Sequence, residues 1–216
     1  MIDEHEISKT DPAFFRYLEA KYLCGRFLDS CGPPRDSYFQ MVLYFDAFLF
    51  CFVSIEEMVS PEKKEELNQL DIFKFFKAAR NVTTHHSILA APFQKNGFVR
   101  GLSRDIYEST GGSRPIASAR FKVNTENFRR IFSTAANRWS KGKRVFQKGK
   151  AYLNRIEANG GIKVYIEDIM AEGLRAVRKT LGYVAQDSIS NRAHEANGED
   201  SVVHEGSARW TKPICP

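Results

Sequence analysis

Two adjacent histidines, His85 and His86, are the residues of this sequence best suited to acid–base chemistry at neutral pH. The chain has five histidines, and the other three lie at the N-terminus or in a polar C-terminal segment. An imidazole titrates close to neutral pH and can act as general base or general acid. Arg80 precedes the pair, and its planar guanidinium suits phosphoryl oxygens. Asn81 adds an amide that can hydrogen-bond a phosphate or orient an imidazole.

The apolar pattern around the two histidines separates their roles. It predicts a helix from Ile72 to about Ala90, with His86 near the centre of the apolar stripe and His85 on its flank. A histidine on an apolar face is usually a satisfied core residue, so we predict that His85 is catalytic and that His86 is structural, a supporting candidate only. The stripe comprises Ile72, Phe75, Phe76, Ala79, Val82 and Leu89.

The spacing of Arg80 and His85 raises a geometric problem. On an ideal helix, positions five apart diverge by roughly 140°, whereas Asn81 and His85, four apart, share a face. Two solutions are open. Either the helix is distorted at residues 82–84, which are β-branched, or a second chain completes the site.

The sequence Arg-Asn-x3-His at residues 80–85 resembles the R-x4-6-H signature of the HEPN superfamily, a group of small helical bundles that includes many ribonucleases. The resemblance implies a metal-independent endoribonuclease with no cofactor and with Arg80, His85 and Asn81 in its catalytic site. Such an enzyme cleaves single-stranded RNA by attack of the 2′-hydroxyl and leaves a 2′,3′-cyclic phosphate. HEPN nucleases are typically homodimers with juxtaposed motifs. They occur as toxins and antiviral-defence factors, which implies a cognate antitoxin or defence partner.

The net charge of +6 is concentrated in the middle third of the chain. Residues 91–160 contain 15 basic and four acidic side chains, a net charge of +11, whereas residues 1–90 carry −4 and residues 161–216 carry −1. Such a segment is either a solvated surface or a phosphate-binding surface. The predicted RNA-binding residues are Arg138, Lys141, Lys143, Arg144, Lys148 and Lys150. A non-catalytic nucleic-acid-binding module or a protein-interaction module is the alternative function.

Helical periodicity predicts a mainly α protein with four core helices. They span about 11–30, 34–59, 72–90 and 162–181, and the basic segment 91–160 is inserted before the last. Inside the insertion, residues 98–106 and 116–123 are two short strands or one irregular arm, followed by helices near 125–139 and 144–158. The helical domain is expected to be HEPN-like and to cover residues 11–182, with a disordered tail at 186–216. We expect Phe14, Phe15, Leu18, Tyr22 and Leu28 to face inward in the first helix.

Asp46 interrupts the most apolar stretch of the chain. Of the 16 residues from Tyr38 to Val53, 14 are apolar, which predicts a central, buried helix. A buried carboxylate must be paired or hydrogen-bonded. Asp46 either bonds a neighbouring group or orients a catalytic cation such as Arg80, and it is a supporting candidate for the site.

Other classes of function lack the motifs that they need. The four cysteines form no zinc-binding spacing, and no nucleotide-binding glycine loop is present. No apolar run reaches about 18 residues, so no membrane span is expected. The acidic N-terminus does not resemble a secretory signal. Cys24 and Cys51 are expected to be buried thiols in a reducing compartment. These observations predict a cytoplasmic protein.

Overall fold

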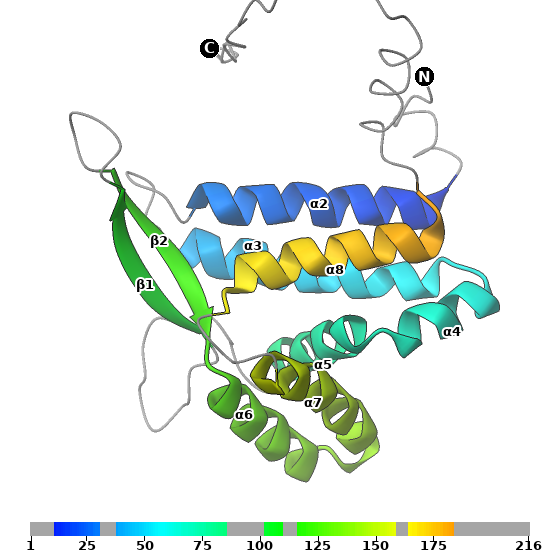
Figure 1. The fold of residues 1–216 in the computed structure, drawn as a ribbon. Coiled ribbons are helices and arrows are strands. Elements are labelled where there is room, and N and C mark those ends of the chain that lie inside the picture. Colours follow the sequence, from blue (N-terminus) through cyan, green and yellow to red (C-terminus); the bar gives the residue numbers. More distant parts are fainter. Residues whose placement is uncertain (1–10, 31–37, 86–101, 110–115, 159–163, 184–216) are drawn as a thin grey trace, which may run out of the picture. The chain divides into compact units, whose positions relative to one another are not determined.

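The computed structural model describes residues 11–30, 38–85, 102–109, 116–158 and 164–183. Within these ranges the side chains of Tyr38, His85, Lys141 and most of the strand residues are not described. The described residues belong to one compact unit. The predicted mainly α class is confirmed (Figure 1). The predicted tail at 186–216 lies outside the described residues.

Four long helices form the predicted bundle. They are α2 (Pro12–Ser30), α3 (Tyr38–Ser54), α5 (Asp71–His85) and α8 (Ile166–Leu181). Helix α2 packs against α3 and α8, and α5 also packs against α3 and α8. A short 3-10 helix, η1 (Ile55–Glu57), follows α3 directly.

A single carboxylate joins the two ends of the unit. Asp11 Oδ1 accepts a hydrogen bond of 3.0 Å from the N–H of Phe14, which caps α2. Its Oδ2 accepts one of 2.9 Å from the hydroxyl of Tyr183, just beyond α8. Helix α8 ends at Gly182, whose φ of 75° is a left-handed conformation that glycine adopts without strain. The start of α2 and the end of α8 are therefore held together.

Two further helix starts follow the capping signals in the sequence. Helix α4 (Pro61–Gln69) begins after Ser60, whose side chain accepts from the N–H of Lys63. Helix α6 (Thr125–Arg138) begins after Asn124, whose side-chain oxygen accepts from the N–H of Asn127 at 2.8 Å. Both caps satisfy backbone donors that the first helical turn leaves free.

The inserted segment contains an antiparallel hairpin and two helices. Strands β1 (Leu102–Ser109) and β2 (Ile116–Val123) pair with Leu102 opposite Val123, so the two-strand alternative is confirmed. Helix α6 leads through a 3-10 turn, η2 (Ser140–Gly142), to α7 (Lys143–Ala158). The hairpin is joined to α8 by Glu167, whose Oε1 accepts a hydrogen bond of 2.9 Å from the N–H of Phe121.

The inserted helices share one core with the bundle, because both pack on α5. The ring of Phe75 lies 5.3 Å from that of Phe128, 6.1 Å from that of Phe132 and 5.4 Å from that of Tyr152. Phe128 and Phe132 belong to α6 and Tyr152 belongs to α7. All four side chains are almost completely buried. The insertion is therefore an integral part of the core.

Phe76, the next residue of α5, packs against the bundle on the other side of the helix. The ring of Phe76 lies 5.3 Å from that of Phe48 and 4.9 Å from that of Phe52, both on α3. Gly173 of α8 lies against the same rings, and a Cβ there would come within 2.7 Å of Phe76. The adjacent residues Phe75 and Phe76 of α5 thus pack against two different groups of helices, α6 with α7 and α3 with α8.

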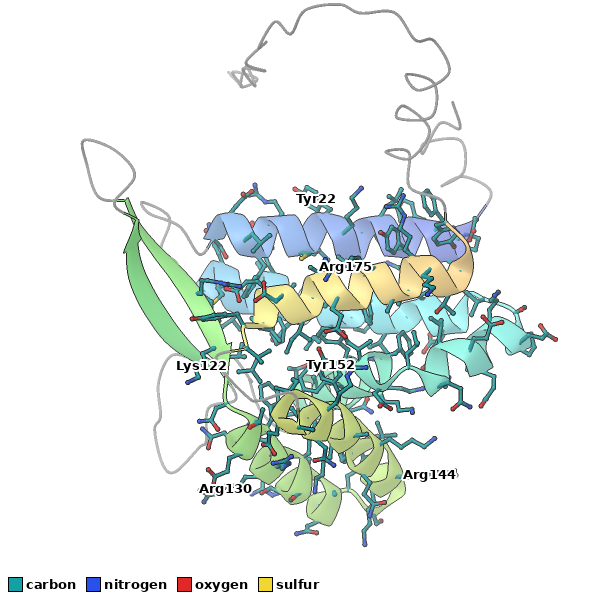
Figure 2. All side chains as sticks on the ribbon, in the orientation of Figure 1. Tyr22, Lys122, Arg130, Arg144, Tyr152 and Arg175 are labelled. Atoms are coloured by element: carbon teal, nitrogen blue, oxygen red, sulfur yellow. The ribbon has the colours of Figure 1, made fainter. Side chains whose placement is uncertain are left out.

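The inward face of α2 differs from the sequence prediction. Phe14 is buried, but Phe15, Tyr22 and Leu28 are exposed; Tyr22 is labelled in Figure 2. One stripe at intervals of three and four residues faces inward instead. Phe15 and Tyr22 are seven residues apart, so they share one face, which lies opposite this stripe. The stripe consists of Ala13, Tyr17, Ala20, Cys24 and Phe27.

The composition of α3 predicted a helix that is buried on all sides, but one of its faces is exposed. Phe39 is 74% exposed, Leu43 51% and Phe50 52%, and these three residues share one face. By length and composition alone, Phe39–Glu57 is apolar enough to cross a membrane, although 56% of that window is buried inside the structure. The sequence predicts no membrane span because no apolar run reaches about 18 residues. Buried helices of globular proteins pass the same composition test.

The close approach of α7 to α5 gives a test of this packing. A Cβ at Gly149 would lie 2.5 Å from the Cβ of Ala78. We expect Gly149→Ala to lower the free energy of unfolding by about 1–2 kcal/mol, because overpacking outweighs the gain in helix propensity. Gly25, on the exposed surface of α2, has no atom within 4 Å of the position that a Cβ would occupy. Gly25→Ala should therefore raise the free energy of unfolding by about 0.5–1 kcal/mol. Urea denaturation measures both, and stabilisation by Gly149→Ala would contradict the packing.

Candidate functional site

The motif lies in the C-terminal half of α5, which runs without interruption from Asp71 to His85. The structure therefore shows no break in α5 at residues 82–84. Ala78 faces Gly149 of α7. On a regular helix, position 85 lies two turns beyond Ala78 on the same side, whereas Arg80 lies on the opposite side. The structure does not bring Arg80 and the backbone of His85 to one face.

Arg80 lies on the side of α5 that faces α3. Its guanidinium carbon is 5.0 Å from the centre of the Phe50 ring, a cation–π contact. Its Nε is buried without a hydrogen-bond partner. Its guanidinium makes no hydrogen bond or ion pair with any residue that the structure describes. The guanidinium of Arg80 thus contacts an aromatic ring, and its N–H donors have no acceptor among the described residues.

The other cations of α5 are neutralised. Lys74 donates to Asp71 Oδ1 at 2.9 Å. Lys77 donates to Glu56 Oε2 at 2.6 Å, in an ion pair whose carboxylate is buried. Arg80 is thus the one cation of the described helix α5 that has no acceptor. An unpaired charge that is buried or half-buried is costly, and the guanidinium of Arg80 can hydrogen-bond an anionic acceptor.

Three polar side chains, Asn81, Thr83 and Thr84, follow Arg80 on α5. The hydroxyls of Thr83 and Thr84 each donate to the carbonyl of Arg80 at 2.9 Å. Asn81 is buried, with 9% of its surface exposed. This burial suits a residue that positions a neighbouring group better than one that meets free substrate. The side chain of His85 and all of His86 lie outside the described residues.

For Asp46, the structure shows neither a hydrogen bond to its buried oxygen nor an ion pair with Arg80, the two alternatives that the sequence left open. Its Oδ1 is buried and has no hydrogen-bond partner, and no ion pair joins it to Arg80. Burial raises the pKa of this carboxyl to about 6. Below about pH 6 the carboxyl is therefore mostly protonated, and above it the carboxylate has no charged partner among the described residues. Asp46 precedes Phe50 by one helical turn, so it lies on the α3 face next to the ring that Arg80 contacts.

The predicted RNA-binding cations are divided by the structure into two groups. Arg138, Lys143, Arg144 and Lys148 have no partner among the described residues. Lys150 instead donates to the hydroxyl of Ser133 at 2.8 Å, which leaves it less available. The side chain of Lys141 is not described.

Two relevant residues were not among the sequence candidates. Arg130 is an exposed cation of α6 without a described partner, and Figure 2 labels it together with Arg144 of α7. Its position opposite the buried Phe128 and Phe132 in an amphipathic helix was the available signal. Phe50 was missed because the apolar composition of α3 predicts a helix buried on all sides. Its presence on the helix face of the polar residue Asp46 could have revealed it.

Neither described thiol is poised as a nucleophile. Burial raises the pKa of Cys24 to about 11, and burial also raises that of Cys51. Both are free cysteines. Within the described ranges, no three side chains of His, Cys, Asp or Glu gather as metal ligands. The chemistry of the described site therefore centres on Arg80.

Comparison with known proteins does not assign a family: no family model matches the sequence, and no curated protein or solved structure is significantly similar to it. The resemblance to the HEPN signature rests on the sequence of residues 80–85.

The raised pKa of Asp46 predicts a pH-dependent contribution to stability. The folded carboxyl keeps its proton up to about pH 6, whereas the unfolded one loses it near the ordinary value of 3.8. Its ionisation therefore destabilises the fold increasingly as the pH rises between these values, and the cost is full above pH 6. We expect Asp46→Asn to raise the free energy of unfolding at pH 7.5 by on the order of 1 kcal/mol, after allowance for screening by solvent.

Urea denaturation at pH 4 and at pH 7.5 tests this expectation, with the exposed Asp29→Asn as control. The gain from Asp46→Asn should shrink toward pH 4. A gain that is equal at both pH values, or a loss at pH 7.5, would show that Asp46 has a stabilising partner.

Proposed function

We propose that the protein is a metal-independent endoribonuclease of the HEPN type that cleaves single-stranded RNA. The observation that carries this proposal is the free guanidinium of Arg80, fixed on the helix that ends at His85. The motif supplies a proton-transfer group and a phosphoryl-binding group, and the exposed cations of α6 and α7 provide attraction for a polyanion. A toxin or antiviral-defence role in the cytoplasm, with a cognate antitoxin or defence partner, is the biological setting that the motif suggests.

The chemistry uses the nucleophile of the RNA itself. The 2′-oxygen attacks the adjacent phosphorus, the bond from phosphorus to the 5′-oxygen breaks, and the products are a 2′,3′-cyclic phosphate and a 5′-hydroxyl. His85 removes the 2′ proton or protonates the leaving 5′-oxygen. Arg80 donates hydrogen bonds to the phosphoryl oxygens as negative charge develops on them. Asn81 positions the imidazole or the phosphate.

The site is completed by a homodimer. In one chain, Arg80 lies on the α3 side of α5 and position 85 lies on the α7 side, so the two residues of a single motif face apart. A second copy related by a two-fold axis brings the arginine of one chain to the histidine of the other. This arrangement removes the geometric conflict without distortion of the helix.

We expect the purified protein to cut single-stranded RNA in the presence of EDTA. Arg80→Ala and His85→Ala should each lower the rate by about 100-fold or more, because each removes transition-state stabilisation or proton transfer. Lys77→Ala, on the same helix but paired with Glu56, is the control and should retain most of the activity. A DNA strand of the same sequence should not be cut. Cleavage that EDTA abolishes, or that both motif variants retain, would refute the mechanism.

A non-catalytic RNA-binding module is the second candidate, and the unpartnered cations of α6 and α7 favour it. Binding through phosphates alone depends steeply on salt because counterions are released. A protein of this kind would bind RNA without cutting it. Absence of any RNA affinity at moderate salt would instead favour a protein-interaction module.

The salt dependence of RNA binding tests the role of these cations. The triple variant Lys143→Gln, Arg144→Gln and Lys148→Gln should reduce the slope of log K against log salt by about 2, at about 0.7 for each lost contact to a single strand. Arg129, Lys150 and Arg155 have side-chain partners within the fold. Their triple replacement by Gln removes the same charge and should change the slope less. Equal slopes for the two triple variants would place the RNA elsewhere.

A further inference from the structure

The exposed ring of Phe50 is a feature that the proposed cleavage chemistry leaves unused. It is 52% exposed although phenylalanine is usually buried. Its ring contacts the guanidinium of Arg80. The ring and the guanidinium together make a flat, partly apolar and positively charged surface at the motif.

The described neighbours of Phe50 on its face of α3 are one carboxyl and two apolar side chains. Asp46, one turn earlier, has its Oδ1 buried, and burial raises the pKa of its carboxyl to about 6. The next exposed side chains along the same face of α3 are Leu43 and Phe39, which are apolar. A molecule that fits here needs an aromatic plane beside an anionic group.

An unpaired nucleotide has these two features. Bases stack on aromatic rings and on guanidinium planes, and a phosphate accepts hydrogen bonds from the free guanidinium donors. We propose that Phe50 and Arg80 together hold one unpaired nucleotide, with its base stacked on Phe50 or on the guanidinium plane and its phosphate bound by Arg80. The inference rests on the proposed function and adds Phe50 as a residue that selects unpaired RNA.

The same face is less suited to a second copy of the chain as its occupant. Three half-exposed side chains offer roughly 300 Å² of apolar surface, well below the 800 Å² or so that each partner buries in a stable interface. A copy seated directly on Phe50 would also cover the guanidinium of Arg80. In the two-chain site proposed above, Phe50 is left as one wall of the cleft.

The test is RNA binding by the full chain with short single strands that carry 2′-O-methyl groups, which cannot be cut by 2′-hydroxyl attack. One strand has all its bases, and the other has abasic nucleotides with the same phosphates. We expect wild-type protein to bind the complete strand about tenfold more tightly than the abasic one. Phe50→Leu should abolish most of this ratio, and Phe50→Trp should preserve it. Phe39→Leu, the same change on the same helix face, should leave the ratio as in wild type.

The outcomes separate this inference from the proposed function. Failure to bind RNA, or a ratio that Phe50→Leu leaves unchanged, overturns the stacking role even if RNA is cleaved. A change of molecular mass in light scattering on Phe50→Leu, without a change in the ratio, shows that a second copy occupies the face. A ratio that depends on Phe50, in a protein that cuts no RNA, refutes the nuclease but supports the nucleotide site.

Discussion

The structure depends on two neighbouring phenylalanines of α5. Phe75 packs against α6 and α7, and Phe76 packs against α3 and α8. Successive helical residues differ by about 100° in direction, so one helix can fill both cores only in one rotation about its axis. That rotation carries Arg80, one turn after Phe76, toward α3, where it meets Phe50. The same rotation places Ala78 and position 85 on the side of α5 that faces α7. The aromatic packing thereby decides which motif residue is available on which surface.

The charges around α5 follow a consistent pattern. Where a cation or carboxylate is needed for the fold it is paired, as in Lys77 with Glu56 or Asp11 with Tyr183. Near Phe50 the charged groups are unpaired. Arg80 has no acceptor among the described residues, and Asp46 has no cationic partner there, so burial raises the pKa of its carboxyl. Unpaired polar groups are costly in a folded chain. Of the three buried side-chain atoms that lack a partner among the described residues, Arg80 Nε and Asp46 Oδ1 lie beside the motif, and the third, Glu167 Oε2, lies on α8. The two beside the motif are the reason to regard this region as a binding surface.

Local signals in the sequence predicted much of the fold. Asp11, Ser60 and Asn124 cap helices, and such caps can be read from sequence because each depends on residues only three or four positions away. The four-helix core was likewise visible from periodicity. The exposed faces of α2 and α3 were not, because apolar composition does not say which side of a helix its neighbours cover. For the site, Arg80 and Asn81 were located by their motif, whereas the contact with Phe50 joins residues 30 positions apart and depends on helix packing.

The central claim is that an arginine and a histidine from different chains make one cleavage site. Mixing two inactive proteins, Arg80→Ala and His85→Ala, measures this directly, after a denaturation and refolding step that lets their chains exchange. Half of the dimers are then mixed, and each mixed dimer has one site with both side chains intact. We predict that RNA cleavage returns to roughly a quarter of the wild-type rate. Wild-type activity in the same protocol with mixed dimers that remain inactive would contradict the two-chain site.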